Sequence, residues 1–322
     1  MQERAITDTI LMIRPVNFRY NEQTAVNNYY QRVIDEVSPA DVQDRARKEF
    51  EMFVEKLRTR GIRVIILDDT PYPDTPDSIF PNNWVSFHSD GRIGLYPMFA
   101  ENRRLERRNE IFDFLRAEYD FHVGNVVDLS GHEKEGKFLE GTGSMVLDRA
   151  NKIVYAALSE RTDKDVLTEF CKKFNYEPVT FTAYQTVDKK RLPIYHTNVM
   201  MCVGDTFAVV CADCIDNEQE RDAVIKSLEE SGKEIIRITE EQVQRFAGNM
   251  LELCARNMPG KKYIVMSASA YESLTRDQRK ALSRHCNLIY SSLDTIEALG
   301  GGSARCMMAE VFLPQVHAKI SK

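Results

Sequence analysis

Three polar side chains in this chain of 322 residues have the types that cysteine-based nucleophilic catalysis requires. Cys306 follows the glycine run 300–302, and glycines let a backbone take left-handed angles and approach a ligand closely. His196 and Glu140 stand in short, mostly apolar segments farther up the chain. In such a set a thiolate attacks a carbon atom, an imidazole exchanges protons, and a carboxylate orients the substrate. Each residue alone also fits an ordinary structural role, because a lone cysteine is most often a small buried hydrophobe.

These three residues all stand at or just before copies of a short sequence pattern that recurs five times. The pattern is a small, amide or thiol residue followed by apolar residues, as in the segment 198–202. By subtraction, the intervals between copies are 60, 55, 51 and 57 residues, and self-similarity at a nearly fixed period is typical of repeat architectures. Glu140 and His196 lie three and two residues before a copy, and Cys306 begins the last one. The copies begin at Asn83, Gly143, Asn198, Asn249 and Cys306.

Between the copies, an amphipathic helix followed by a short β-rich run also recurs five times, which predicts an α/β fold of five units. Thr275 is expected to cap the fifth helix, and Gly232 to end the fourth. Units this short cannot bury their apolar faces alone, so we expect them to pack around a common centre. The strands expected after the helices are 63–67, 126–129, 178–182, 234–238 and 288–292.

The order of the repeats predicts how the two ends of the chain meet. The strand 10–14 opens the first unit, whereas the copy that carries Cys306 comes at the far C-terminus. We therefore expect the C-terminal strand to join the N-terminal unit and to close a ring of five, with the residues that begin the copies around one cavity. On this hypothesis residues 1–322 form a single catalytic domain, although length alone would allow two domains.

Composition and charge argue against several classes of protein. Apolar residues make up 43% of the chain, no run approaches the length of a membrane span, and the N-terminus lacks a signal segment. Seven cysteines without a paired spacing predict a reduced, cytoplasmic protein, and Cys211 and Cys214 are better explained as two core cysteines than as half of a zinc site. The net charge of -6 argues against a nucleic-acid partner. We expect neither a membrane nor a nucleic-acid partner, and the sequence leaves open whether the chain forms a homodimer.

Four motifs carry the candidate residues: Phe80-Pro81-Asn82-Asn83-Trp84, Glu140-Gly141-Thr142-Gly143-Ser144, Tyr195-His196-Thr197-Asn198 and Gly301-Gly302-Ser303-Ala304-Arg305-Cys306. With these motifs the chain resembles the guanidine-modifying enzymes of the pentein fold, a five-bladed α/β-propeller of ββαβ-type units around a central active site. That superfamily includes arginine deiminases, dimethylargininases and glycine amidinotransferases, and the resemblance covers essentially the whole chain. The motifs look most like the citrulline-utilisation hydrolase subgroup, which is often described only as amidinotransferase.

The resemblance implies a role for each candidate residue. Cys306 would be the nucleophile, His196 the general acid and base, and Glu140 the group that orients the substrate. The segment 158–162 is similar to the family segment whose arginine holds the substrate α-carboxylate. This similarity implies that role for Arg161, with Arg104 as a weaker second candidate.

Three asparagines depart from the pattern of the arginine deiminases. Asn83 and Asn198 stand where those enzymes have aspartates that bind the cationic guanidinium, and Asn82 replaces the arginine before the first of them. A buried guanidinium needs carboxylate partners, because an unpaired buried charge is strongly destabilising. Amides offer donors as well as acceptors, which suits a neutral ureido group. We therefore expect this set of asparagines to bind a neutral substrate in preference to a cation.

The sequence thus favours a cysteine-dependent hydrolase of a small ureido or guanidino amino acid, with citrulline first, giving ornithine, ammonia and carbon dioxide. An arginine deiminase, a dimethylargininase-like hydrolase and an amidinotransferase remain alternatives, because the sequence does not distinguish water from an amine as the acceptor. A binding module without chemistry is disfavoured, since the non-catalytic proteins of this fold generally lack the cysteine, histidine and carboxylate. No metal ion or organic cofactor is expected, because a thiolate, a proton shuttle and hydrogen-bonding groups suffice.

Overall fold

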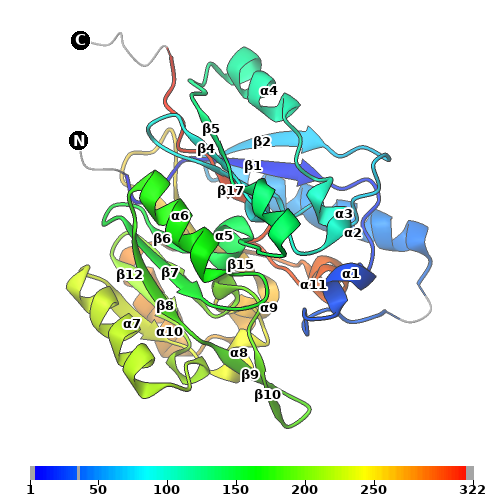
Figure 1. Ribbon diagram of the computed structural model, residues 1–322. Coiled ribbons are helices and arrows are strands. Elements are labelled where there is room, and N and C mark those ends of the chain that lie inside the picture. Colours follow the sequence, from blue (N-terminus) through cyan, green and yellow to red (C-terminus); the bar gives the residue numbers. More distant parts are fainter. Residues whose placement is uncertain (1–3, 35–36, 317–322) are drawn as a thin grey trace.

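The computed structural model describes residues 4–34 and 37–316, and within them five three-stranded sheets share one pairing pattern (Figure 1). The middle strand of each sheet pairs antiparallel with one neighbour and parallel with the other. A separate antiparallel hairpin is formed by β9 and β10. The strands are β1 Thr9–Arg14, β2 Arg63–Asp68, β3 Val85–Phe87, β4 Ile93–Leu95, β5 Val126–Asp128, β6 Val146–Asp148, β7 Ile153–Ala157, β8 Glu177–Phe181, β9 Tyr184–Val187, β10 Lys190–Pro193, β11 Met201–Val203, β12 Phe207–Val210, β13 Glu234–Arg237, β14 Leu251–Cys254, β15 Lys262–Ser267, β16 Asn287–Ser291 and β17 Ala309–Glu310. The fold is therefore a mixed α/β fold built from small sheets.

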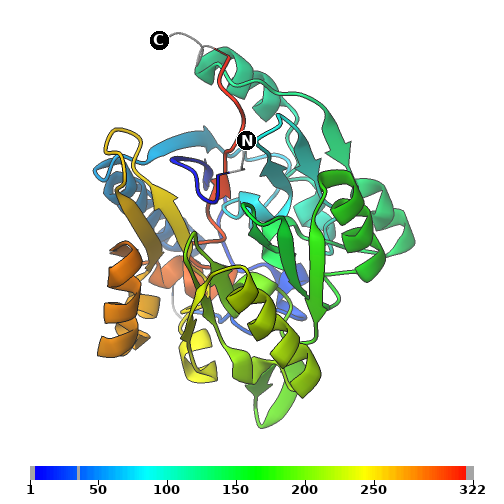
Figure 2. The ribbon, with the colours of Figure 1, turned by 90° about the vertical axis from the view of Figure 1, so that its left-hand side faces the viewer.

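Helices connect the parallel strands of the sheets, as parallel pairing requires a crossover. Figure 2 shows α6, α7 and α10, coloured green, yellow-green and orange, on the outside of the molecule, with their sheets nearer its middle. The helices are α1 Glu22–Ala25, α2 Pro39–Arg58, α3 Glu101–Arg104, α4 Glu110–Tyr119, α5 Gly141–Ser144, α6 Lys164–Phe174, α7 Glu218–Glu230, α8 Glu240–Val243, α9 Ala268–Ser273, α10 Arg276–His285 and α11 Asp294–Gly300. The short 3-10 helices are η1 Pro81–Asn83, η2 Ser130–Glu135, η3 Thr197–Val199 and η4 Ala212–Cys214. No helix in the described part of the chain is both long enough and apolar enough to span a membrane.

The third strands of the sheets follow the sequence prediction closely, since β2, β5, β8, β13 and β16 agree with the expected ranges to within one residue at each end. Thr275 caps α10 in a capping box with Gln278, and Gly232 takes a φ of +78° just after α7. The C-terminal strand β17 pairs antiparallel with β1, which places the two ends of the chain in one sheet. First strands of different sheets also contact one another, with β17 against β3 and β11 against both β6 and β14.

The residues that begin the repeated pattern lie ahead of the strands and not at their first positions. Asn83 ends η1, Gly143 lies in α5 and Asn198 lies in η3, whereas the strands that follow begin at Val85, Val146 and Met201. The 3-10 turns close through backbone bonds to the third residue back, as from Met200 N to Thr197 O at 3.1 Å. Asn83 and Asn198 therefore lie outside the strand ladders, and their side chains are available for contacts at the ends of the sheets.

Helix α2 shows how an outer helix is held on its sheet. Its buried residues recur at helical spacing and pack toward β2, β16 and α11. Ser38 caps the helix by accepting from Asp41 N at 3.1 Å, and Pro39 occupies the first turn, where its missing N–H is not needed. The buried face is Val42, Ala46, Phe50, Phe53, Val54 and Leu57.

Truncating this face should destabilise the fold without touching the candidate site. Phe53 is 0% exposed, so Phe53→Ala should lower the free energy of unfolding by about 3–5 kcal/mol, because it leaves a cavity that the neighbours fill only in part. Met52 on the same helix is 48% exposed, and Met52→Ala should change it by less than about 1 kcal/mol. Urea denaturation followed by circular dichroism measures both values. Equal losses from the two variants would contradict this packing.

Candidate active site

A cavity with an empty volume of about 260 Å³ brings together Cys306 and His196. Segments far apart in the sequence line it, from the N-terminal α1 region to the glycine run before Cys306. The lining residues are Thr24, Asn28, Asp77, Phe80, Asn83, Arg103, Arg161, Tyr195, His196, Gly300, Gly302 and Cys306.

The glycine run presents Cys306 by allowing a close approach of its neighbours. Gly301 ends α11 with a φ of +60°, in the left-handed region that glycine adopts without strain. A Cβ atom on Gly300 would lie 2.7 Å from the ring of Phe80, so no side chain fits there. Tyr195 donates its hydroxyl hydrogen to Gly301 O at 2.8 Å, which ties the run to the segment between β10 and η3. The loop is therefore held on both sides.

Amide groups surround the sulfur of Cys306. Asn249 Nδ2 lies 3.2 Å from Sγ, and Asn198 Nδ2 lies 3.6 Å from it. Asn249 Oδ1 accepts from Arg305 N at 3.0 Å, which fixes the amide so that Nδ2 donates to the sulfur and also to Asn198 O, at 3.1 Å. Hydrogen-bond donors favour the charged form of an acid, so this arrangement can stabilise a thiolate. Sequence reasoning placed Asn249 at the cavity but assigned it no role, although its position in the repeat was the available signal.

His196 and Glu140 form a short buried pair, with His196 Nε2 and Glu140 Oε2 2.7 Å apart. Burial would raise the pKa of Glu140, but Arg161 and His196 outweigh it and hold the pKa well below its ordinary value. Burial also lowers the pKa of His196 to about 4, against the opposing effect of Glu140. Because an ionised carboxylate can only accept, the neutral imidazole carries its proton on Nε2 and leaves a lone pair on Nδ1. His196 can thus act as a base through Nδ1.

Arg161 is buried and linked to both Glu140 and the N-terminal region. Its Nη1 lies 3.4 Å from Glu140 Oε2, Nε donates to Asn27 Oδ1 at 2.9 Å, and Nη2 donates to Thr24 O at 2.8 Å and to Asn27. These contacts occupy four of the five guanidinium donors, which leaves one N–H on Nη1. The guanidinium also lies over the ring of Tyr195, with Cζ 4.8 Å from the centroid.

The predicted asparagines do not all reach this cavity. Asn83 lines it, with Oδ1 accepting from Arg103 at 2.9 Å, and Nδ2 finds no hydrogen-bond partner in the described part of the chain. Asn82 lies behind it and donates to Thr142 Oγ1 at 3.3 Å. Arg104 donates to backbone oxygens, at 3.0 Å to Met98 O, whereas its neighbour Arg103 lines the cavity. The sequence could not distinguish these two adjacent arginines.

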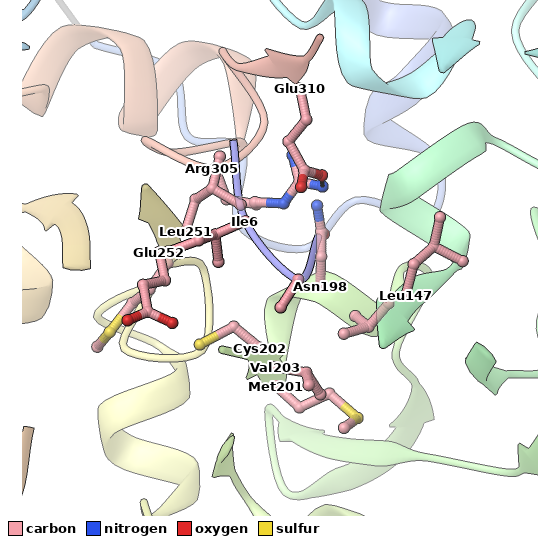
Figure 3. Close-up of a pocket in the computed structure, with 13 residues that line it drawn as sticks. Ile6, Leu147, Asn198, Met201, Cys202, Val203, Leu251, Glu252, Arg305 and Glu310 are labelled. Atoms are coloured by element: carbon pink, nitrogen blue, oxygen red, sulfur yellow. Dashed lines mark hydrogen bonds and ion pairs between the residues drawn. The ribbon is translucent and has the colours of Figure 1, made fainter. Parts of the chain in front are cut away.

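Asn198 lies between Cys306 and a second pocket, of about 410 Å³ empty volume, that is shown in Figure 3. Arg305 and Glu310, joined at 2.8 Å, line this pocket together with Cys202 and Glu252. Asn198 is thus a neighbour of the sulfur and faces the second pocket, while the cavity that holds His196 is lined by other residues.

Asp77 is a buried carboxylate of the cavity that sequence reasoning missed. Its Oδ2 accepts from Asn21 at 2.7 Å and from Thr24 at 3.1 Å, while Oδ1 has no hydrogen-bond partner among residues 4–34 and 37–316. Burial raises the pKa of Asp77, although Arg103 opposes the shift. The free oxygen is suited to an ammonium or guanidinium group. Its place three residues before Phe80 was the only signal in the sequence.

No metal ligand set accompanies these residues. Within the described ranges no group of three or more His, Cys, Asp or Glu side chains is arranged to hold a metal ion. The chemistry that the cavity offers is that of a thiol, an imidazole and hydrogen-bonding side chains.

Comparison with known proteins assigns the chain to a family. The model of the family described as N,N dimethylarginine dimethylhydrolase, eukaryotic, matches residues 14–313. The chain belongs to this family. It is therefore a member of the pentein superfamily of guanidino-modifying enzymes, as its motifs predicted. None of the curated proteins matches it significantly in sequence.

Solved structures share the fold at low sequence identity. The N-terminal domain of ArgZ, an arginine dihydrolase from the ornithine-ammonia cycle in cyanobacteria, superposes with a TM-score of 0.68 at 17% identity, covering 94% of this chain and 97% of that domain. The apo structure of ArgZ gives a TM-score of 0.70 at 18% identity, and the match covers 97% of this chain and 42% of the ArgZ chain. A dimethylarginine dimethylaminohydrolase in an adduct with S-methyl-L-thiocitrulline gives 0.61 at 14% identity, covering 95% and 99% of the two chains.

The amide beside the sulfur should control how readily Cys306 reacts. Asn249→Asp replaces the N–H donors by acceptors next to Sγ, so the rate of alkylation of Cys306 by iodoacetamide at pH 8 should fall by about tenfold or more. The rate is measured by mass spectrometry of the Cys306 peptide. Asn287→Asp, on an exposed position of β16, is the matched control and should leave the rate unchanged. A folded Asn249→Asp variant that reacts at the wild-type rate would contradict the assignment.

The buried imidazole should make the fold sensitive to mild acid. Its pKa is about 4 in the folded protein and about 6.5 in an unfolded chain, so only the unfolded state gains a proton as pH falls from about 7.5 to about 5.5. Stability therefore decreases as the pH is lowered. Over this range the free energy of unfolding of wild type should decrease by about 1 kcal/mol more than that of His196→Asn. Glu140 stays ionised in both states there, so it does not contribute. Urea denaturation at the two pH values measures the difference, and equal losses would refute it.

Proposed function

We propose that the chain is a cysteine-dependent hydrolase of a ureido or guanidino amino acid, with citrulline as the preferred substrate. In this proposal residues 1–322 act as one pentein catalytic domain, with five units closed around the site. The observation that carries it is the cavity lined by both Cys306 and His196, in which the free amide hydrogens of Asn83 can bind an uncharged oxygen. Membership of a dimethylarginine dimethylhydrolase family supports the hydrolase reading.

The charged residues of the cavity suit the amino-acid end of the substrate. Arg161 keeps one free N–H on Nη1 for an α-carboxylate, and Asp77 keeps a free carboxylate oxygen for an α-ammonium group. Both are buried, so these contacts would be shielded from water and stronger than on a surface. Agmatine, which lacks the carboxylate, should therefore be a poor substrate.

The reaction begins at the central carbon of the ureido group. The Cys306 thiol passes its proton to the neutral imidazole of His196 as its sulfur forms a bond to this carbon, and the carbonyl electron pair moves to oxygen to give a tetrahedral adduct. Its collapse breaks a C–N bond, with the same proton delivered by His196 to the leaving nitrogen, and leaves a thiocarbamate on Cys306. His196 then takes a proton from water, which attacks the same carbon. Collapse of this second adduct breaks the C–S bond, and the proton returns from His196 to the sulfur. The carbamate that is released breaks down to an amine and carbon dioxide.

A guanidino substrate is the second candidate. The free oxygen of Asp77 could pair with a guanidinium cation, and the structural neighbours include an arginine dihydrolase and a dimethylarginine dimethylaminohydrolase. An amidinotransferase would use the same thiol adduct with an amine in place of water, and incubation with labelled ornithine or glycine would detect the exchange. Neither reaction requires a metal ion or an organic cofactor.

An ammonia-release assay tests the proposal. Wild type should hydrolyse citrulline with a higher kcat/KM than arginine, methylated arginines or agmatine, and Cys306→Ala should abolish release. Asn83→Asp puts a carboxylate oxygen in place of the free amide nitrogen, so it should shift the preference toward arginine by about tenfold or more, as expected for one charge-assisted contact. An enzyme that turns over arginine efficiently and ignores citrulline would refute the substrate assignment. Full activity in Cys306→Ala would refute the mechanism.

A further inference from the structure

Helix α3 carries two adjacent arginines in different environments. The side chain of Arg103 is 3% exposed and that of Arg104 is 27% exposed. Arg103 binds both carboxylate oxygens of Glu106, at 2.8 and 2.9 Å, and donates to Phe80 O at 3.2 Å. Burial lowers the pKa of Arg103, but the carboxylates around it outweigh this effect and keep it above its ordinary value. Arg103 is thus a fixed, charged donor at the wall of the cavity.

The contact between Arg103 and Asn83 determines which way the amide faces. Arg103 Nη1 donates to Asn83 Oδ1 at 2.9 Å. A guanidinium has only donors, so the alternative amide orientation would oppose one N–H donor with another. The nitrogen of Asn83 therefore has to face away from Arg103.

The nitrogen that is turned away lies beside the imidazole. A Cβ placed on Gly143 would lie 2.3 Å from Asn83 Nδ2 and 2.8 Å from His196 Nδ1, so both nitrogen atoms pack closely against Gly143 and lie near each other. Asn83 Nδ2 has no hydrogen-bond partner in the described residues, and both side chains line the cavity with Cys306. An acceptor atom of a ligand in the cavity can take the missing hydrogen bond from Asn83 Nδ2, whereas a donor atom cannot.

We infer that Arg103, held in place by Glu106, sets the selectivity of this cavity for an uncharged carbonyl oxygen over a guanidinium nitrogen. Arg103 acts through Asn83 and is a positioning residue. A ureido oxygen accepts from the oriented amide, and the adduct oxygen would accept more strongly once it carries negative charge. A guanidinium offers only N–H groups, which meet the N–H groups of Asn83. The inference rests on the proposed function, because it explains why citrulline would be preferred to arginine.

Removing the Arg103–Glu106 pair should allow the side-chain amide of Asn83 to rotate, because the contact that fixes its orientation is lost. Arg103→Met/Glu106→Leu removes both charges together, so neither is left unpaired in the interior. Asn83 could then turn its oxygen toward the cavity, and the ratio of kcat/KM for citrulline to that for arginine should fall on the order of tenfold or more. Arg103→Gln is a milder variant that keeps a long polar side chain able to accept as well as donate, and it should lower the ratio in the same direction.

Two controls separate selectivity from general damage. Arg103→Lys keeps a side chain that can only donate, so it should retain most of the wild-type ratio. Arg104→Met changes the adjacent arginine, which lies outside the cavity, and should leave the ratio unchanged. Thermal unfolding of each variant confirms that the chain is folded before kinetics are compared.

The outcomes distinguish this inference from the proposed function. If wild type prefers citrulline and the folded Arg103→Met/Glu106→Leu or Arg103→Gln variant keeps that preference, the role of Arg103 is refuted and the proposed function stands. If wild type hydrolyses neither substrate, or prefers arginine, the proposed preference for citrulline fails and the inference fails with it. A lowered ratio in Arg103→Met/Glu106→Leu and Arg103→Gln supports the inference when Arg103→Lys retains most of the wild-type ratio and Arg104→Met leaves it unchanged.

Discussion

The buried carboxylate of Glu140 is the group around which the candidate site is organised. It is 0% exposed, and an uncompensated charge in that position would be strongly destabilising. Its partners come from separate segments: His196 at 2.7 Å, Phe99 N at 2.9 Å and Arg161 at 3.4 Å. Arg161 in turn binds Asn27, which draws the N-terminal region over the cavity. Compensation of one charge thus holds together segments that are far apart in the sequence, and it fixes the tautomer of the imidazole.

Two buried ion pairs flank the cavity, and each acts on the reacting end through a neutral group. Glu140, held by Arg161, orients the imidazole of His196, and the Arg103–Glu106 pair orients the amide of Asn83. The reacting end is therefore lined by neutral hydrogen-bonding groups. The formal charge in the cavity that is open to a ligand is on the unpaired oxygen of Asp77 and on the remaining N–H of Arg161. This division suits a substrate with a zwitterionic end and an uncharged head.

Periodic features were predictable from the sequence, and the particular contacts of the site were not. Apolar spacing indicated that five helices occur and gave the third strands to within one residue at each end, and the cap of Thr275 follows from local chemistry alone. The repeat indicated that Cys306 and His196 would share a cavity. It could not show that Arg103 and not Arg104 faces inward, because in the four-residue helix α3 tertiary packing alone decides the direction of each side chain. Asp77 was missed because it lies in a segment without a periodic pattern.

The surroundings of the sulfur are consistent with the same division of charge. A guanidinium substrate brings a positive charge close to an attacking thiolate, and this charge can itself favour ionisation. A ureido substrate brings none, so the stabilising donors have to come from the protein. Among the described residues the hydrogen bonds to Cys306 Sγ come from the amides of Asn249 and Asn198, one of them aligned by the backbone N–H of Arg305. On the proposed function, Asn83 would bind the substrate oxygen and Asn198 would donate to the sulfur of Cys306, so the two amides would have separate roles. An aspartate in place of Asn198 would instead bring a negative charge to the thiolate, which only a cationic substrate could offset.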